Sequence, residues 1–165
     1  MNSSLFYSLL KKKFPFEPTY KQDIFFQKIA IFLTEMENKT IFVLKGYAGT
    51  GKTTTISTLV TNLWKTEKKA VLLAPTGRAA KVFSHKSETD AFTIHKHIYR
   101  RKSKVDITSG LDLQLNLFKN TVFFVDEASM IGDYTLLKDG QINPRNLLED
   151  LVEYVYSGDG CKLIL

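Results

Sequence analysis

Four short apolar runs lie along the chain, and each has the length of a buried strand rather than that of a helix. Because they are apolar almost throughout, without polar residues at every second position, they are typical of strands covered on both faces. The runs are Ile41 to Lys45, Ala70 to Ala74, Thr121 to Val125 and Lys162 to Leu165. They predict a parallel sheet with helices on both faces.

Two stretches between these runs have apolar residues at the spacing of a helix. Apolar residues at i, i+3, i+4, i+7 and i+8 predict a helix with one face against the sheet. The first such stripe comprises Ile56, Leu59, Val60, Leu63 and Trp64. The second comprises Leu147, Leu148, Leu151, Val152 and Val155. Asn143 suits the N-cap of the second helix, and Pro144 its first position. Strands that alternate with helices predict an α/β fold.

The composition agrees with a single globular domain over residues 1–165. The chain is 44% hydrophobic and 24% charged, and it shows no repeat or linker. Cys161 is the only cysteine, and no positive residue precedes the apolar run Leu5 to Leu10, so neither a disulfide nor a signal peptide is predicted. No window reaches the roughly 18 apolar residues that a membrane-spanning helix needs. We therefore expect a cytoplasmic, intracellular protein without membrane association.

Charge is distributed unevenly along the chain. The net charge is +6, but residues 1–110 carry 19 Lys/Arg against 8 Asp/Glu, whereas residues 111–165 carry 4 against 9. A basic N-terminal part suits a polyanionic partner. Lysines along solvated helices would produce the same excess, so charge alone does not decide between the two interpretations.

The strongest chemical signal follows the first apolar run. Residues 46–53 read Gly-Tyr-Ala-Gly-Thr-Gly-Lys-Thr and match GxxxxGK[ST], the P-loop or Walker A pattern. Glycines allow backbone N–H groups to converge on phosphates, Lys52 can reach the β- and γ-phosphates and assist catalysis, and Thr53 can ligate Mg²⁺. The predicted nucleotide-binding residues are Gly46, Tyr47, Ala48, Gly49, Thr50, Gly51, Lys52, Thr53 and Thr54.

A carboxylate pair follows the third apolar run. Asp126 and Glu127 come directly after Val125, at the end of a strand where ligands bind in open α/β sheets. An Asp-Glu pair alone is more often only a strand exit into solvent. With a complete P-loop upstream it predicts a Walker B pair, in which Asp126 holds the Mg²⁺ shell and Glu127 is the general base for the attacking water.

Five sequence blocks occur in a distinctive order. They read Thr-Tyr-Lys-Gln (19–22), the P-loop (46–53), Ala-Pro-Thr-Gly-Arg-Ala-Ala (74–80), Thr-Ile-His (93–95) and Asp-Glu-Ala-Ser-Met (126–130). A P-loop kinase or GTPase has no reason to carry the third block. Over about residues 17–165 the chain resembles superfamily-one DNA helicases of the RecD-like and Dda-like group. The resemblance implies a three-layer RecA-like P-loop domain, ATP and Mg²⁺ as cofactors, 5′–3′ helicase activity, and a role in DNA repair or recombination.

The first block has two interpretations, which are compatible. The resemblance implies that Gln22 contacts adenine. Thr19 and Gln22 also fit a capping box, in which each side chain bonds the backbone N–H of the other residue at the start of a helix. The core face of that helix would consist of Phe25, Ile29, Phe32 and Leu33.

The third and fourth blocks resemble motifs that follow the backbone of single-stranded DNA. The residues implied are Thr76, Gly77, Arg78, Thr93 and His95. From Arg78 to Lys104 there are eight Lys/Arg and two acids, interleaved with Phe83, Phe92 and Tyr99, and cations with aromatic rings suit a single-strand channel. Alternatively, Thr76 only caps a helix and the three rings belong to the core. His95 and His97 match no zinc spacing.

The resemblance also implies parts that lie outside the chain or are reduced in it. Relatives insert a small strand-separating pin at about residues 100–120, which here is short, and residues 1–16 form a flanking segment. In relatives a second RecA-like domain follows and supplies arginines, which can be worth about 10³–10⁵ in rate. We therefore expect a piece of a longer helicase that binds ATP·Mg²⁺, hydrolyses it slowly, binds single-stranded DNA weakly and does not unwind alone.

Two other functions compete with the helicase interpretation. One is a small self-contained P-loop kinase or phosphotransferase, which would need an arginine-bearing lid and an acceptor pocket that the sequence after Glu127 does not clearly show. The other is a non-enzymatic nucleotide-binding module. The resemblance also allows exonuclease or repair subunits as partners.

Overall fold

A five-stranded parallel sheet forms the centre of the computed structural model, which describes residues 1–34, 39–47, 49–101, 111–132, 135–136, 142–143 and 146–165. In spatial order the strands are β1 (Ile41–Phe42), β9 (Lys162–Ile164), β6 (Thr121–Val125), β2 (Lys69–Ala74) and β3 (Ala91–Thr93). Every neighbouring pair is parallel. This confirms the predicted α/β class.

The predicted strands differ from the observed ones mainly at the two edges of the sheet. At one edge β1 is only two residues long, although Leu44 N–H donates to the carbonyl of Leu165 at 2.8 Å, so hydrogen bonding continues beyond it. At the other edge β3 was not predicted. A three-residue edge strand with a partly exposed burial pattern has no apolar run by which to recognise it.

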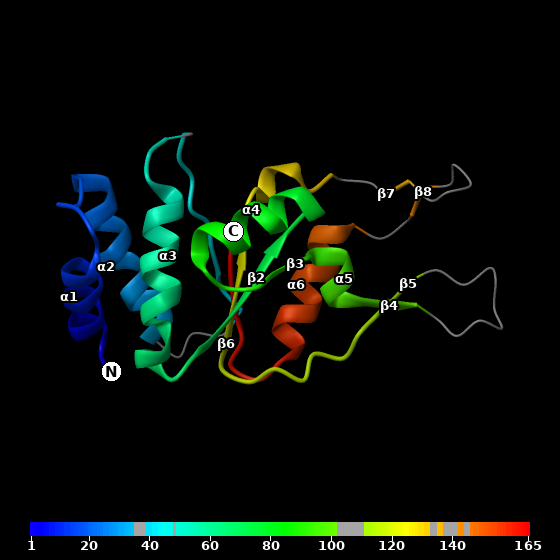
Figure 1. The fold of residues 1–165 in the computed structure, drawn as a ribbon. Coiled ribbons are helices and arrows are strands. Elements are labelled where there is room, and N and C mark those ends of the chain that lie inside the picture. Colours follow the sequence, from blue (N-terminus) through cyan, green and yellow to red (C-terminus); the bar gives the residue numbers. More distant parts are fainter. Residues whose placement is uncertain (35–38, 48, 102–110, 133–134, 137–141, 144–145) are drawn as a thin grey trace.

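Helices cover both faces of the sheet (Figure 1). On one face lie α1 (Ser3–Lys13), α2 (Tyr20–Thr34), α3 (Lys52–Asn62) and α4 (Gly77–Ser87); on the other lie α5 (Ile94–Ile98) and α6 (Leu147–Ser157). Successive strand residues serve opposite cores, because side chains alternate across a sheet. Leu72 and Phe124 pack with the first set of helices, whereas Leu73 and Phe123 pack with the second.

The ends of two helices differ from the prediction. The regular turns of α3 end at Asn62, and a 3₁₀ helix, η1 (Leu63–Thr66), follows. Because this change of winding breaks the 3.6-residue spacing, Trp64 is 63% exposed rather than part of the apolar stripe. Helix α6 is capped by Asn146, whose side chain accepts from the N–H of Leu148 at 2.8 Å. The predicted cap, Asn143, belongs instead to a short strand, and Pro144 lies outside the described residues.

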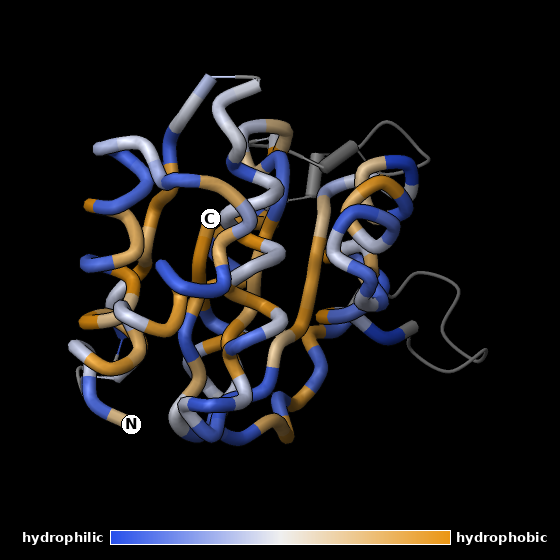
Figure 2. Tube along the Cα trace, turned by 60° about the vertical axis from the view of Figure 1, so that its left-hand side comes forward, coloured by the Kyte–Doolittle hydropathy of each residue, from blue (hydrophilic) through white to orange (hydrophobic). Residues whose placement is uncertain are grey.

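The N-terminal segment contributes to the core. Phe6 and Leu10 of α1 are fully buried, and Phe14 meets Phe26 of α2 with ring centroids 5.3 Å apart. Lys11 also pairs with Asp23 at 3.0 Å. Figure 2 shows hydrophobic and hydrophilic residues alternating along these helices. Residues 1–16, predicted as a flanking segment, thus contribute to the core between the sheet and helices α1 to α4.

Two small antiparallel ribbons and one short turn complete the described structure. Strand β4 (Tyr99–Arg101) pairs with β5 (Leu111–Leu113), within the region where a short insertion was predicted. Strand β7 (Thr135–Leu136) pairs with β8 (Ile142–Asn143), and the 3₁₀ turn η2 (Ala128–Met130) precedes them. Among the described residues, none of the helices has the length and apolar character needed to cross a membrane.

Candidate nucleotide-binding site

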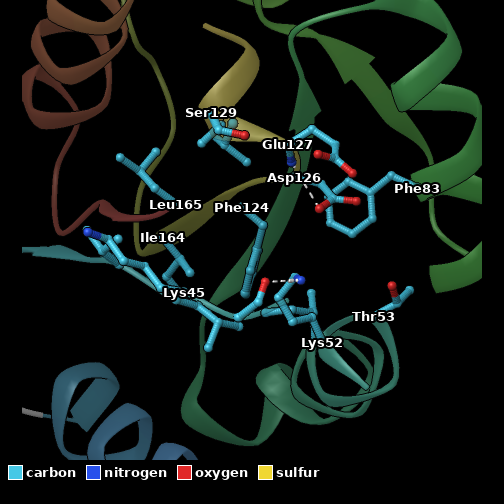
Figure 3. Close-up of a pocket in the computed structure, with 16 residues that line it drawn as sticks. Lys45, Lys52, Thr53, Phe83, Phe124, Asp126, Glu127, Ser129, Ile164 and Leu165 are labelled. Atoms are coloured by element: carbon cyan, nitrogen blue, oxygen red, sulfur yellow. Dashed lines mark hydrogen bonds between the residues drawn. The ribbon is translucent and has the colours of Figure 1, made fainter. Parts of the chain in front are cut away.

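The carboxyl ends of the parallel strands meet at one edge of the sheet, and the predicted site residues gather there. The P-loop follows β1, the block beginning at Pro75 follows β2, and Asp126 follows β6. Figure 3 shows Lys52 and Thr53 on α3 on one side of a cleft that Asp126 and Glu127 border from another side. The sheet therefore brings together residues that are more than 70 positions apart in the sequence.

The P-loop depends on two glycines in the left-handed region of backbone space. Gly49 has φ +77° and Gly51 has φ +79°, angles that L side chains rarely adopt. The amino group of Lys52 donates to the carbonyls of Gly46 at 2.5 Å and Tyr47 at 2.8 Å. An ammonium has three N–H donors, so Lys52 can brace the loop and still donate to a phosphate oxygen. Ala48 lies outside the described residues.

Gln22 connects α2 to this loop. Its Oε1 accepts from the N–H of Thr19 at 2.9 Å, and its own N–H donates to Oγ1 of Thr19 at 3.4 Å, which confirms the predicted capping box. Its Nε2 donates to the carbonyl of Thr50 at 3.3 Å. Gln22 therefore fixes the start of α2 and the P-loop against each other.

Gly51→Ala tests the packing between these two segments. A Cβ at this position would lie 2.8 Å from Nε2 of Gln22, on a backbone with φ +79°. We expect the free energy of unfolding to fall by about 1–2 kcal/mol, because a side chain in the left-handed region is strained. Chemical denaturation measures this free energy of unfolding.

The matched control is Gly77→Ala. Gly77 lies in the first turn of α4, and a Cβ there would meet no atom within 4 Å. We expect that substitution to be neutral or to stabilise by up to about 1 kcal/mol, since alanine favours a helix. Equal effects of the two substitutions would contradict the packing argument.

The carboxylate pair stands at a sharp change of backbone direction. Asp126 N–H donates to the carbonyl of Leu73 at 3.1 Å, and Oδ1 of Asp126 accepts from the N–H of Glu127 at 3.0 Å. Glu127 has φ +55°, an uncommon conformation for a residue other than glycine. Asp126 and Glu127 both line a cleft of about 650 Å³ together with Lys52, Thr53 and Ser129. Ser129 was not predicted to be a site residue, although it lies within the fifth block.

A larger cleft of about 1110 Å³ adjoins the other side of the P-loop. It shares Gly46 and Lys52 with the first cleft, and Gln22 lines it. Its walls include Phe16 and Tyr20, which are 69% and 81% exposed. Neither ring was predicted to be a site residue, because the proximity of these rings to the loop depends on the packing of α1 and α2.

The two clefts suit different parts of a nucleotide. Thr53 and Asp126 are the side chains suited to hold Mg²⁺, which in phosphate sites keeps several waters and uses few protein ligands. No group of three His, Cys, Asp or Glu side chains within the described ranges is placed to bind a metal by itself. The aromatic cleft beside Gln22 has the apolar walls that suit a base.

The residues predicted to contact DNA lie at the same edge of the sheet. Oγ1 of Thr76 accepts from the N–H of Ala79 at 3.2 Å, and Oγ1 of Thr93 accepts from the N–H of Lys96 at 3.3 Å. Each threonine therefore caps a helix, α4 or α5. Gly77 follows Thr76 and Arg78 is exposed, whereas His95 is half-buried, and burial lowers its pKa.

The three aromatic residues of the basic segment have different environments. Phe83 is 3% exposed and Tyr99 7% exposed, so both belong to the core, whereas Phe92 is 40% exposed. The prediction that rings alternate with cations along a channel is therefore wrong for Phe83 and Tyr99. Their burial depends on contacts with α3 and α6, which spacing in the sequence does not show.

Comparisons with known proteins agree with this geometry. The family described as the AAA domain matches residues 26–138. RecBCD enzyme subunit RecD from Buchnera aphidicola subsp. Acyrthosiphon pisum (strain APS) is 33% identical over 147 residues, which cover 74% of this chain and 22% of RecD. This chain thus spans about a fifth of the length of that relative. With its P-loop and its parallel sheet, the chain belongs to the AAA-domain family, as a nucleotide-binding P-loop domain of the RecD-like helicase type.

Proposed function

We propose that this chain is the ATP-binding motor domain of a 5′–3′ DNA helicase. The observation that carries the proposal is the convergence of Lys52, Thr53, Asp126 and Glu127 on one cleft at the carboxyl edge of the sheet. Family membership supports an ATPase of the RecD-like type. Residues 1–165 form one motor domain in this proposal, with the β4–β5 ribbon as its short insertion.

The proposed chemistry assigns one task to each side chain. The P-loop backbone binds the phosphates, and Lys52 stabilises the negative charge on the β- and γ-phosphates. Thr53 and Asp126 hold Mg²⁺, which when bound neutralises charge on the transferred phosphoryl group. Glu127, which is exposed and borders the same cleft, accepts a proton from the attacking water.

The adenine end of the nucleotide is proposed to lie beside Gln22. Its amide has one N–H and one lone pair beyond the bonds to Thr50 and Thr19. A planar amide can read the edge of adenine, which offers both a donor and an acceptor. The aromatic cleft that Gln22 lines, with Phe16 and Tyr20, encloses this position.

Slow turnover is part of the proposal. Among the described residues that line the clefts beside the P-loop there is no arginine. In phosphoryl transfer an arginine supplied from outside the P-loop can be worth about 10³–10⁵ in rate. We propose that a second RecA-like domain supplies it, so this chain binds ATP·Mg²⁺ but hydrolyses it slowly and does not unwind DNA alone.

Single-stranded DNA is the proposed polymer partner, bound weakly by this domain. The residues proposed to contact it are Thr76, Gly77, Arg78, Thr93 and His95, which follow β2 and β3 at the edge that carries the nucleotide site. The matched relative is named as a subunit of the RecBCD enzyme. We propose an intracellular role in repair or recombination, with exonuclease or repair subunits as partners of the parent protein.

The test of this function is ATP binding by the chain with Mg²⁺ and with a chelator, by calorimetry. Asp126→Asn should lower the affinity gained from Mg²⁺ by about 10- to 100-fold, a loss typical when a group that supports a metal is changed. Turnover should stay slow with or without single-stranded DNA. Brisk turnover by the chain alone would overturn the need for a second domain.

Asp90→Asn is the matched control. Asp90 is exposed and precedes β3, so it lies at the opposite edge of the sheet from the P-loop. Its substitution removes the same charge and should leave the Mg²⁺-dependent affinity unchanged. If both variants lose the same affinity, net charge rather than a ligand at position 126 explains the result.

A further inference from the structure

A third cleft, of about 510 Å³, lies between α5, α6 and the segment that follows β5. Phe92 of β3, Lys96 and His97 of α5, Phe118 and Tyr154 line it. It shares no lining residue with the two clefts beside the P-loop. In Figure 1 these elements lie on the opposite side of the sheet from α1 and α2. The nucleotide site therefore does not explain this cleft.

A stack of rings forms its wall. The ring of His97 lies against Phe92, with centroids 6.0 Å apart and an interplanar angle of 29°, and against Phe118, at 5.5 Å and 33°. Phe123 and Tyr154 meet the same imidazole edge-on, each at 5.9 Å. These contacts hold His97 and Phe92 in a fixed orientation before any ligand binds.

His97 has an unsatisfied hydrogen-bonding atom. Its Nε2 is buried, and no described residue forms a hydrogen bond with it. Burial lowers the pKa of His97, so the imidazole is neutral near pH 7 and can donate or accept according to its tautomer. A buried polar atom without a partner is costly, so a ligand group that pairs with it is favoured.

The rim of the cleft is aromatic and cationic. Phe92 is 40% exposed, and the amino group of Lys96 stands 5.9 Å from the centre of its ring. No acidic residue is among the described residues that line the cleft. An exposed ring face beside a cation is the combination that proteins use for unpaired bases and their phosphates.

We propose that this cleft takes an unpaired base of single-stranded DNA, which stacks on Phe92 while its edge pairs with His97. The proposal rests on the DNA-binding function proposed above and names a contact that carries base affinity. Phe92 directly precedes Thr93 and Lys96 directly follows His95, so the cleft adjoins the segment that is proposed to follow the DNA backbone. Lys96, on the same helix, is available to a phosphate beside the stacked base.

The rim of the cleft also has an apolar part. Leu115 and Leu117 at the rim are 86% and 84% exposed, and exposed leucines suit an apolar surface of a protein partner. An apolar side chain could not satisfy Nε2 of His97, and it would gain nothing from Lys96. A base satisfies both, because it has a stacking face, polar edge atoms and an attached phosphate.

The experiment compares two strands that differ only in their bases. Fluorescence anisotropy at low salt measures the affinity of the chain for a single strand of about ten nucleotides and for an abasic strand of the same length. We expect the wild type to prefer the strand with bases. Phe92→Ala should weaken binding of that strand by roughly 10-fold and remove most of the preference. Phe92→Leu, which keeps an apolar side chain in β3, should do the same.

Trp64→Ala is the matched control. Trp64 is 63% exposed and has the amino group of Lys65 at 3.9 Å from its ring, yet it lines none of the three clefts. Its loss should leave the preference unchanged. Thermal unfolding of each variant verifies that the domain is folded.

Each other outcome has a definite meaning. A wild type without preference for bases, or a preference that survives in both Phe92 variants, overturns the base site and leaves the cleft to a protein partner. Failure of the wild type to bind either strand overturns the proposed DNA-binding function itself. The two failures are therefore distinguishable.

Discussion

Lys52→Ala should strongly weaken ATP binding. The amino group of Lys52 stands between the carbonyls of Gly46 and Tyr47, within reach of phosphates held by the loop. A hydrogen bond from a charged donor contributes about 1.5–3 kcal/mol, and the remaining N–H of Lys52 would make such a bond to the phosphates, while the ammonium charge adds electrostatic attraction. We therefore expect the affinity for ATP·Mg²⁺ to fall by at least about 100-fold, measured by calorimetry.

Lys65→Ala provides the control for this experiment. Lys65 follows Trp64 in η1 and lies outside the three clefts, so the variant loses an equal charge without touching the P-loop. Its affinity for ATP should match that of the wild type. Thermal unfolding of Lys52→Ala should show a folded domain. Retention of affinity within a few-fold in a folded Lys52→Ala variant would remove the P-loop from the binding site.

Phe26→Ala should cause a large loss of stability. Phe26 is fully buried, and its ring meets Phe14 at 5.3 Å and Phe25 at 5.7 Å between centroids. Removing a buried phenylalanine side chain costs about 3–5 kcal/mol. Because native domains are stable by only about 5–15 kcal/mol, the variant should unfold at much lower denaturant concentration. Urea denaturation followed by circular dichroism measures the change.

Phe16→Ala is the comparison for this prediction. Phe16 is 69% exposed, and its ring touches that of Phe14 edge-on with centroids 6.1 Å apart. The Phe16→Ala variant therefore loses the same kind of side chain, but from the surface. We expect it to cost less than about 1 kcal/mol. If Phe26→Ala also costs so little, then α1 and α2 are not part of the cooperative core, and the role assigned to the N-terminal segment is wrong.

Local patterns in the sequence correctly predicted the parts of the site that a single segment forms. The P-loop lies between a strand and a helix, as its spacing predicts, and Asp126 follows a strand whose bounds match the predicted Thr121–Val125. The capping box of Thr19 and Gln22 also forms as predicted. Each of these features depends on backbone geometry within a few residues.

Patterns failed where the environment comes from distant segments. Asn143 and Asn146 are chemically equal as caps, and only the packing of α6 decides that Asn146 begins the helix. Phe83 and Phe92 have the same side chain, yet one is 3% exposed and the other 40%. Periodicity describes the face on which a residue lies but does not reveal what covers that face.

Sequence by itself therefore determined the α/β class, the phosphate-binding loop and the carboxylates at the strand end, because short-range spacing encodes them. Tertiary structure decided which segments meet. It joined Gln22 to the carbonyl of Thr50, placed two aromatic rings beside the P-loop, and surrounded His97 with rings from β3, β6 and α6. These contacts connect residues separated by up to about 60 positions in the sequence. Burial of apolar surface is the main force that brings such segments together, and a single sequence does not show which surfaces will be buried against each other.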